Sequence, residues 1–465
     1  MVIPVVVGLA LFMEYLDGMA IMTAIPAMAQ SLNSDPAHLS LAVTAYLLTL
    51  AIFIPASGWV ADRCGARTVF QVAMAIFTLA SILCGISQTL PQLLIGRVLQ
   101  GFGGALMAPV ARLILIRTFP KSELVRAMSW FTIPGLIGPA LGPPLGGFLT
   151  DFSSWRWIFL INVPVGVAGI VLTAFLIENY REPEAKPFDW RGFFLTGGAL
   201  GSSLYSVDAI GHGAATGWVA AFLLLGALIL VLLAIRHGRV GINPLIDLKL
   251  LRLPTFRVSN TGGLLFRIAL NGAIVLQPVL VQVGFGMTAF QSALLTVCGA
   301  VGMIMIRLWI RHLLKRFGFR RSLIWNGLFT ALTLGVVCFF TPGTPVVFFV
   351  AAYFACGVAR SFQFMAISTI VYSDVPPEQA SAATGFSSMA DQFAAAVGAS
   401  TAGILLQLAA SWRGVTAEAL TASDIQWAMG AMALLAVLSV PPMMRLRSDA
   451  GAEVSGHRRA SSGPG

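Results

Sequence analysis

The chain has 465 residues, of which 57% are hydrophobic and only 10% are charged, with a formal net charge of +10. A soluble protein of this length carries about 25% charged residues. The composition therefore excludes a water-soluble globule and indicates a protein that lies within a lipid bilayer.

Fourteen long apolar runs follow one another along the chain, each close to the roughly 20 residues that a membrane-spanning helix needs. Runs of this length favour helices over a β-barrel, because barrel strands alternate over only about ten residues. The predicted fold class is an all-α polytopic membrane protein with fourteen transmembrane helices. The runs are residues 2–28, 38–60, 68–88, 92–117, 124–150, 156–177, 190–210, 217–236, 255–283, 289–312, 320–341, 344–372, 380–410 and 425–444.

The 29 Lys and Arg residues gather at one end of the predicted helices. If the N-terminus is cytoplasmic, only Arg156 and Arg413 fall near the outer face, and Arg97, Arg267 and Arg360 fall inside helices. This positive-inside pattern predicts cytoplasmic N- and C-termini. A basic inner face that contacts anionic lipid accounts for the net charge, so we expect no nucleic-acid partner.

The sequence also lacks the usual signatures of metal, nucleotide and enzyme chemistry. No cysteine pair has the spacing of metal ligands, so neither a metal nor a cofactor is expected. No G-x-x-x-x-G-K-[ST] loop occurs, so direct use of ATP is not expected. No nucleophile and base form a recognisable set, so we predict that the chain is not an enzyme.

Two charged loops share the pattern x-R-x-G-x-R. One is DRCGAR (62–67), after the second apolar run, and the other is KRFGFR (315–320), after the tenth. Their positions indicate two related six-helix halves with two helices inserted between them. The predicted segments are a six-helix bundle at 1–177, the inserted pair with its linkers at 178–254, a second bundle at 255–444 and a disordered cytoplasmic tail at 445–465.

Five stretches of sequence together point to one family. They are LDGMAIMTAIP (16–26), GWVADRCGAR (58–67), RVLQGFGGA (97–105), PGLIGPALGPPLGG (134–147) and WRWIFLINVPVG (155–166). The three stretches at 58–67, 97–105 and 134–147, in this order and spacing, resemble the major facilitator superfamily of secondary transporters. The stretches at 16–26 and 155–166, with the fourteen-helix layout, narrow the resemblance to its drug:proton antiporter branch. The resemblance implies two bundles that alternate access to a small-molecule site near the membrane midplane.

The loop after the second run resembles the gate loop of this family, in which an acidic residue is held by a basic residue or a helix end of the same half. The resemblance assigns that role to Asp62, with Arg126 as a candidate partner. The alternative is that the arginines only anchor the loop at the inner face. The predicted gate residues are Gly58, Asp62, Arg63, Gly65, Arg67 and Arg126.

Arg97 lies inside an apolar run, where a charge costs roughly 2.5–3.5 kcal/mol on insertion scales and needs a partner or a function. Asp17 lies at a similar predicted depth, and a carboxylate whose charge depends on such a pair is suited to proton coupling. The resemblance gives both motifs that role, and the alternative is a static ion pair. Glu14 shares a helix face with Asp17. We expect it to add a second proton site or to contact a cationic substrate, unless it is simply protonated or reaches the inner face.

The stretch 134–147 combines glycines, which let helices approach closely, with prolines, which bend a helix. In the family this signature marks exporters, and the alternative is a motif that serves packing alone. The residues of the predicted antiporter motif are Gly135, Gly138, Pro139, Gly142, Gly146 and Gly147.

Polar side chains inside the runs are candidates for a substrate cavity, and Arg360 and Asp391 are candidates to pair with each other. Arginines favour an anionic substrate whereas Glu14 and Asp17 favour a cationic one, so the charge of the substrate stays open. The candidates are Gln100, Arg267, Asn271, Gln277, Arg360, Gln363, Asp391 and Gln392.

The predicted function is proton-coupled efflux of small, amphipathic compounds by alternating access, performed by a monomer in the bacterial inner membrane. Its partners are a small-molecule substrate, protons and the lipid bilayer. One alternative is an exporter of an anionic metabolite or a metal chelate. The other is a sensor on the same fold that does not transport.

Overall fold

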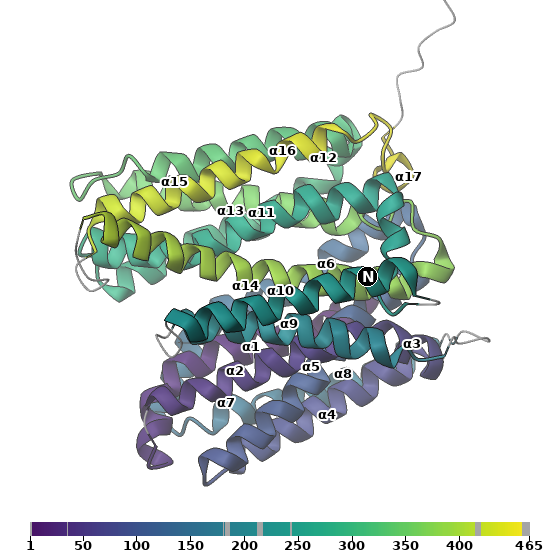
Figure 1. The fold of residues 1–465 in the computed structure, drawn as a ribbon, viewed down its shortest axis with the longest axis horizontal. Coiled ribbons are helices and arrows are strands. Elements are labelled where there is room, and N and C mark those ends of the chain that lie inside the picture. The colour runs from purple at the N-terminus through teal and green to yellow at the C-terminus, as the bar shows by residue number, and fades with distance from the viewer. Residues whose placement is uncertain are drawn as a thin grey trace, which may run out of the picture. The chain divides into compact units, whose positions relative to one another are not determined.

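The structure is a computed structural model that describes residues 2–34, 36–179, 181, 187–211, 217–241, 244–413 and 420–457. The described residues form helices and no strand, which confirms the all-α fold class (Figure 1). The chain divides into two compact units. The first comprises 1–120, 127–249 and 376–389, and the second comprises 121–126, 250–375 and 390–465.

In the first unit, α5 is the most buried membrane segment, with 78% of its apolar window inside the protein. It contacts α1, α2 and α4, while α8 packs against α1 and α4. This central position lets α5 carry side chains that lipid does not reach. The helices are α1 (Val2–Ser31), α2 (Pro36–Phe53), η1 (Ile54–Ala56), α3 (Ser57–Cys64), α4 (Ala66–Ile86), α5 (Leu90–Thr118), α6 (Lys121–Phe152), α7 (Trp157–Leu160), α8 (Asn162–Leu176), α9 (Trp190–Gly211) and α10 (Gly217–Val240).

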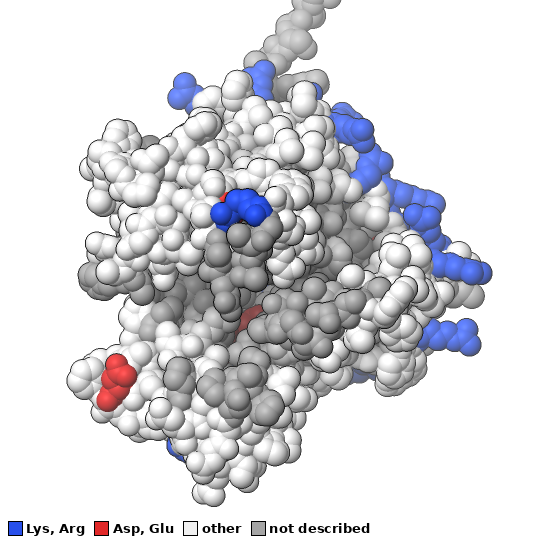
Figure 2. All heavy atoms as spheres, turned by 60° about the vertical axis from the view of Figure 1, so that its left-hand side comes forward, with Lys and Arg blue, Asp and Glu red and all other residues white. Residues whose placement is uncertain are grey.

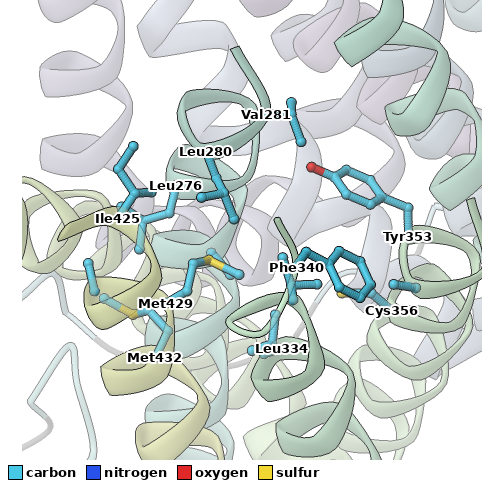
Figure 3. Close-up of a cluster of buried hydrophobic side chains, with 14 of the residues drawn as sticks. Leu276, Leu280, Val281, Leu334, Phe340, Tyr353, Cys356, Ile425, Met429 and Met432 are labelled. Carbon is cyan, nitrogen blue, oxygen red and sulfur yellow. The ribbon is translucent and has the colours of Figure 1, made fainter. Parts of the chain in front are cut away.

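The second unit has its own apolar cluster where α11, α12, α13 and α15 meet. Figure 3 shows side chains of this cluster, among them Leu276 of α11 and Met429 and Met432 of α15. Lipid is as apolar as these side chains, so close van der Waals contact rather than exclusion of water holds them together. The elements are η2 (Leu248–Arg252), α11 (Pro254–Val279), η3 (Leu280–Gly284), α12 (Ala289–Val337), α13 (Val346–Ile370), the larger part of α14 (Ala380–Trp412), α15 (Ala422–Leu438), α16 (Val440–Met444) and α17 (Ala452–Ser455). The short helix η4 (Pro377–Gln379) and the start of α14, up to residue 389, belong to the first unit.

The described helices agree with the predicted runs. By length and hydropathy, 11 of them can cross a membrane, or 12 if the bent helix α6 counts as one span. The two further predicted runs lie in α9 and in the second part of α12. Helix α12 is interrupted by a kink at Gly318, whose φ of 71° and ψ of 168° are not helical. Fourteen transmembrane helices are therefore consistent with the structure.

The inserted helices belong to the first unit, where α10 packs on α9 and α9 packs on α2. Aromatic rings make this attachment, since Phe53 lies 5.6 Å from Phe193 of α9 and 4.8 Å from Phe102 of α5, measured between ring centroids. The domain boundaries drawn from the sequence stay a prediction.

The predicted disordered tail is wrong for the part that the structure describes. Residues 445–457 are folded and include α17, which contacts α12. Leu446 and Val454 are buried, and the ring Nδ1 of His457 lies 2.8 Å from the carbonyl oxygen of Lys315. The composition suggested disorder because it is rich in small and charged residues, but these apolar side chains anchor the segment. Residues 458–465 lie outside the described part.

The described surface is poor in charge, as the composition requires. Figure 2 shows a face that is mostly uncharged, with Lys and Arg side chains chiefly along its edges. Such a surface suits contact with lipid acyl chains.

Candidate functional site

Asp17 of α1 and Arg97 of α5 form an ion pair, and both side chains are fully buried. The Nε of Arg97 donates to the carbonyl oxygen of Ala42 at 3.1 Å. The guanidinium also lies over the ring of Tyr46, 4.4 Å from its centroid. The expected contact is therefore present, and the role of the pair in proton transfer stays a prediction.

Two amides complete the surroundings of the Asp17 carboxylate. Gln100 Nε2 and Asn162 Nδ2 each lie 3.3 Å from Asp17 Oδ1. Both amide groups also donate to Ser81 Oγ, at 2.7 Å and 3.4 Å respectively. Gln100 was expected to line a substrate cavity, but this network buries it completely, so that assignment is wrong for this conformation.

Close helix contact brings these groups together. A Cβ at Gly101 would lie 2.6 Å from the carbonyl oxygen of Tyr46, and one at Gly103 would lie 2.8 Å from that of Ala73. Without side chains at these two positions, α5 approaches α2 on one side and α4 on the other. The glycines of the RVLQGFGGA motif thus hold Arg97 and its neighbours in place.

Glu14 lies one helical turn before Asp17 and is also buried, with only 8% of its surface exposed. Its Oε2 has no hydrogen-bond partner among the described residues. Arg112 of α5 is the positive charge that acts on it, and Arg112 Nη1 donates to Ser388 Oγ at 3.2 Å. Our sequence reasoning missed Arg112, although it is a second arginine in the run 92–117.

The gate loop is held by a different arginine from the one expected. Asp62 Oδ1 lies 2.8 Å from Arg117 Nη2, and Asp62 Oδ2 accepts a hydrogen bond from Ser381 Oγ. The prediction of Arg126 as partner is wrong, because the last turn of α5 brings Arg117 to α3. Arg126 is exposed in the first turns of α6 and groups with the second unit.

The remaining gate residues have distinct roles. Gly65 has a φ of +92°, which side-chain-bearing residues rarely adopt, so it permits the turn between α3 and α4. Arg67 Nη1 donates to the carbonyl oxygen of Ile177 at 3.2 Å, just past the end of α8, where a cation complements the helix dipole. Gly58 approaches Ser381, and Arg63 is exposed.

Four of the five glycines of the predicted antiporter motif line the side of α6 that faces α1. A Cβ at Gly138 would lie 3.0 Å from Leu16 N, and one at Gly142 would lie 2.6 Å from Met19 Cβ. Gly135 and Gly146 make similar approaches to α1. Pro139 is exposed, Gly147 faces open space, and the helix bends by 45° across the proline-containing stretch 139–144.

In the second unit, Arg267 of α11 forms an ion pair with Asp391 of α14 at 2.8 Å. Sequence reasoning proposed Arg360 as the partner of Asp391 and did not foresee this contact. Asn271 donates to the backbone of Arg267 at 2.8 Å, and Gln277 lies 3.6 Å from Cys356 Sγ. The half-buried candidates in this unit are Asn271, Gln277, Arg360, Asp391 and Gln392.

Gln363 does not line a cavity in this conformation, contrary to expectation. It is fully buried and joins three helices, since it accepts from Asn326 Nδ2 at 2.9 Å and lies 3.2 Å from Met443 Sδ. Arg307 of α12 is buried as well, with 7% of its surface exposed. Arg307 was not among the residues predicted from the sequence, where it lies near the end of the apolar run 289–312.

An aspartate–arginine pair buried within the membrane segments of a helical protein is typical of a pathway for a substrate or an ion, and so of a polytopic membrane transporter. The sequence matches the family described as the Major Facilitator Superfamily over residues 7–399. The chain belongs to this family of transporters, and it is a multi-pass membrane protein.

Curated relatives agree with this assignment. "Putative multidrug resistance protein MdtD" of Escherichia coli (strain K12) is 34% identical over 460 residues, which cover 98% of this chain and 97% of the relative. The protein of the same name from Pectobacterium atrosepticum is 37% identical over 402 residues, 86% of each chain.

Solved structures show the same fold at 14% sequence identity. The human organic anion transporter MFSD10 has a TM-score of 0.66 and covers 95% of this chain and 98% of its own. The proton:xylose symporter XylE has a TM-score of 0.64 and covers 98% of both chains.

Proposed function

We propose that this protein is a proton-coupled secondary active exporter of small, amphipathic compounds. The observation that carries the proposal is the buried pair of Asp17 and Arg97, because an ionisable pair inside a membrane protein is typical of a proton or ion pathway. The names of the MdtD relatives, at 34–37% identity, support drug export.

In the proposed cycle, Asp17 alternates between two states. As a carboxylate it is held by Arg97 and the two amides, and as a neutral acid it no longer attracts the guanidinium. Protonation from one side of the membrane and release to the other then links proton movement to the rearrangement of α1 and α5. A substrate that binds to the opposite conformation is then exported against its own concentration gradient while the proton moves down its gradient.

Two further features fit this cycle. Gly138 and Gly142 bring α6 into close contact with α1, the helix that carries Asp17. A movement of α1 is therefore transmitted to the bent helix α6, which carries the predicted antiporter motif. The contacts of Asp62 with Arg117 and Ser381 hold the gate loop in this conformation, and they must break for the other one to form. We further propose a monomer in the bacterial inner membrane with both termini in the cytoplasm, on the positive-inside pattern of the sequence.

The test uses purified protein in liposomes with an imposed pH gradient and a lumenal pH dye. Cationic drugs are added first, then carboxylates, then metal chelates. The expected result is proton flux that a cationic drug triggers and that Asp17→Asn abolishes. Asp424→Asn is the matched control, since Asp424 is another buried aspartate that is paired with an arginine, Arg413.

Other outcomes separate the alternatives. Flux only with carboxylates or chelates would favour an exporter of anionic compounds, which Arg267 and Arg360 would suit. Absence of flux with every ligand, together with an Asp17→Asn strain that behaves like the parent, would contradict transport and favour a sensor.

A further inference from the structure

The Asp17 carboxylate is surrounded by hydrogen-bond donors. Arg97 donates to Oδ2, and Gln100 Nε2 and Asn162 Nδ2 donate to Oδ1. These are all the hydrogen bonds that Asp17 makes with the described residues. The arrangement suits the charged carboxylate, because a carboxylate only accepts, whereas a neutral carboxyl group needs an acceptor for its own O–H.

The obvious acceptors nearby are already engaged. Gln100 Oε1 accepts from Arg97 Nη1 at 2.8 Å and from Cys84 Sγ at 3.5 Å. Ser81 Oγ accepts from both amides and donates its own proton to the carbonyl oxygen of Phe77 at 2.8 Å. A hydroxyl oxygen has two lone pairs, and both are occupied here.

Asn162 is different, because its Oδ1 is buried and has no hydrogen-bond partner among the described residues. The residue is 1% exposed and stands at the first position of α8. A half-turn of the amide about its last side-chain bond exchanges Nδ2 and Oδ1 without moving the backbone. The oxygen then lies where the nitrogen was, 3.3 Å from Asp17 Oδ1.

We propose that Asn162 is a positioning residue that turns its amide when Asp17 takes up a proton. In the charged state its N–H donates to the carboxylate, and in the neutral state its carbonyl oxygen accepts the new O–H. The proton remains on Asp17, and only hydrogen bonds change. The inference rests on the proposed function, in which Asp17 is the proton site.

Other ionisable groups face Asp17 from the helices around it. They are Arg97 of α5, Glu14 of α1, Tyr46 of α2 and Cys84 of α4. The positive charge of Arg112 acts on Glu14. Of these, Tyr46 is the rival acceptor, since its hydroxyl is also buried without a partner among the described residues. That hydroxyl, however, lies beside Gly104, one helical turn beyond Gln100.

The test is a pH titration of the full protein in liposomes by infrared difference spectroscopy, which needs no substrate. The probe is the carbonyl stretch of a protonated carboxyl group, assigned to Asp17 by its loss in Asp17→Asn. In Asn162→Leu, a substitution of similar size, the neutral acid loses its acceptor and the carboxylate loses one of its three donors. The midpoint therefore changes for two opposing reasons, whereas the frequency of the band depends only on the neutral acid. We expect the band to move to higher frequency in this variant, because the O–H of Asp17 no longer has an acceptor.

Two further variants complete the test. Ser81→Ala removes the atom that holds the Asn162 amide in its donating orientation, so the midpoint is expected to rise. Asn260→Leu is the matched control, since Asn260 of α11 also has a buried Oδ1 without a partner in the described chain, and it should leave the midpoint unchanged.

The failures are distinguishable. If the wild type shows no Asp17 band at any pH, the proposed proton site itself is wrong. If the band is present but Asn162→Leu leaves its frequency unchanged, or Ser81→Ala fails to raise its midpoint, the role of Asn162 is refuted. A frequency shift in Tyr46→Phe with none in Asn162→Leu would make Tyr46 the acceptor.

Discussion

Asp62 at the end of α3 and Arg117 in the last turn of α5 lie 2.8 Å apart, and the second oxygen of the same carboxylate accepts from Ser381. The gate loop is thus held by a side chain of its own unit, at a position that the loop sequence does not reveal. Arg117 and Asp62 are partly exposed, at 12% and 21%. The pair can therefore break without burying a lone charge, as a gate that opens requires.

The first prediction concerns this gate. Arg117→Ala removes the charge that holds Asp62, so we expect proton-coupled transport to fall several-fold and labelling of the exposed Cys64 by a thiol reagent to change. Arg126→Ala is the matched control, because Arg126 is exposed and is not the partner of Asp62. Equal losses of transport in both variants would show that the ion pair of Asp62 with Arg117 is not the cause of the loss.

The second prediction concerns the buried pair. Arg97→Ala leaves Asp17 without its counter-charge in a fully buried site, which costs about 3–5 kcal/mol for a buried pair. We expect a clear loss of thermal stability in detergent together with loss of proton flux. Arg413→Ala should destabilise less, since Arg413 is 37% exposed. A melting temperature like that of the wild type would argue that water already reaches Arg97.

The third prediction concerns the contact between α6 and α1. In Gly142→Ala, the new Cβ would lie 2.6 Å from Met19 Cβ, so one helix must move, at a cost of about 1–3 kcal/mol. In Gly147→Ala the new methyl meets open space. Thermal unfolding and transport of the two variants, measured side by side, should separate them, and an equal effect would remove the packing explanation.

The fourth prediction concerns the start of α9, where Asp189 lies 2.8 Å from His237 of α10 and caps α9. Burial works to raise the pKa of Asp189, but the backbone N–H groups of Gly192 and Leu245 and the ring of His237 outweigh it, so the pKa is lowered. Because the folded pKa lies below the unfolded value of about 3.9, the stabilisation is present above that value. It is lost as the pH falls through the folded pKa.

Asp189→Asn is therefore expected to lower the melting temperature at neutral pH, and the difference from the wild type should disappear in strong acid. Asp449→Asn is the control, because its pair with Arg447 is largely exposed, with the Arg447 side chain at 78%. A difference that persists unchanged in strong acid would mean that the carboxylate charge of Asp189 is not the cause.

Composition and hydropathy were sufficient for the class of fold, because a chain with 10% charged residues can satisfy its backbone in lipid only as helices or a closed barrel. The motifs were sufficient for the family. They also predicted the contact between Asp17 and Arg97, since two opposite charges at one membrane depth have few other ways to be satisfied. The glycine spacing in α6 predicted a close helix contact, although not that α1 is the neighbour.

The tertiary structure decided everything that depends on which helix faces which. Arg117 rather than Arg126 holds Asp62, and Gln100 and Gln363 are buried in hydrogen-bond networks rather than in a cavity. An apolar run has no polar face to reveal its rotation, so sequence cannot say where a glutamine within it points. Asn162 lies 145 residues from Asp17 in the chain and joins its carboxylate only because α8 packs against α1.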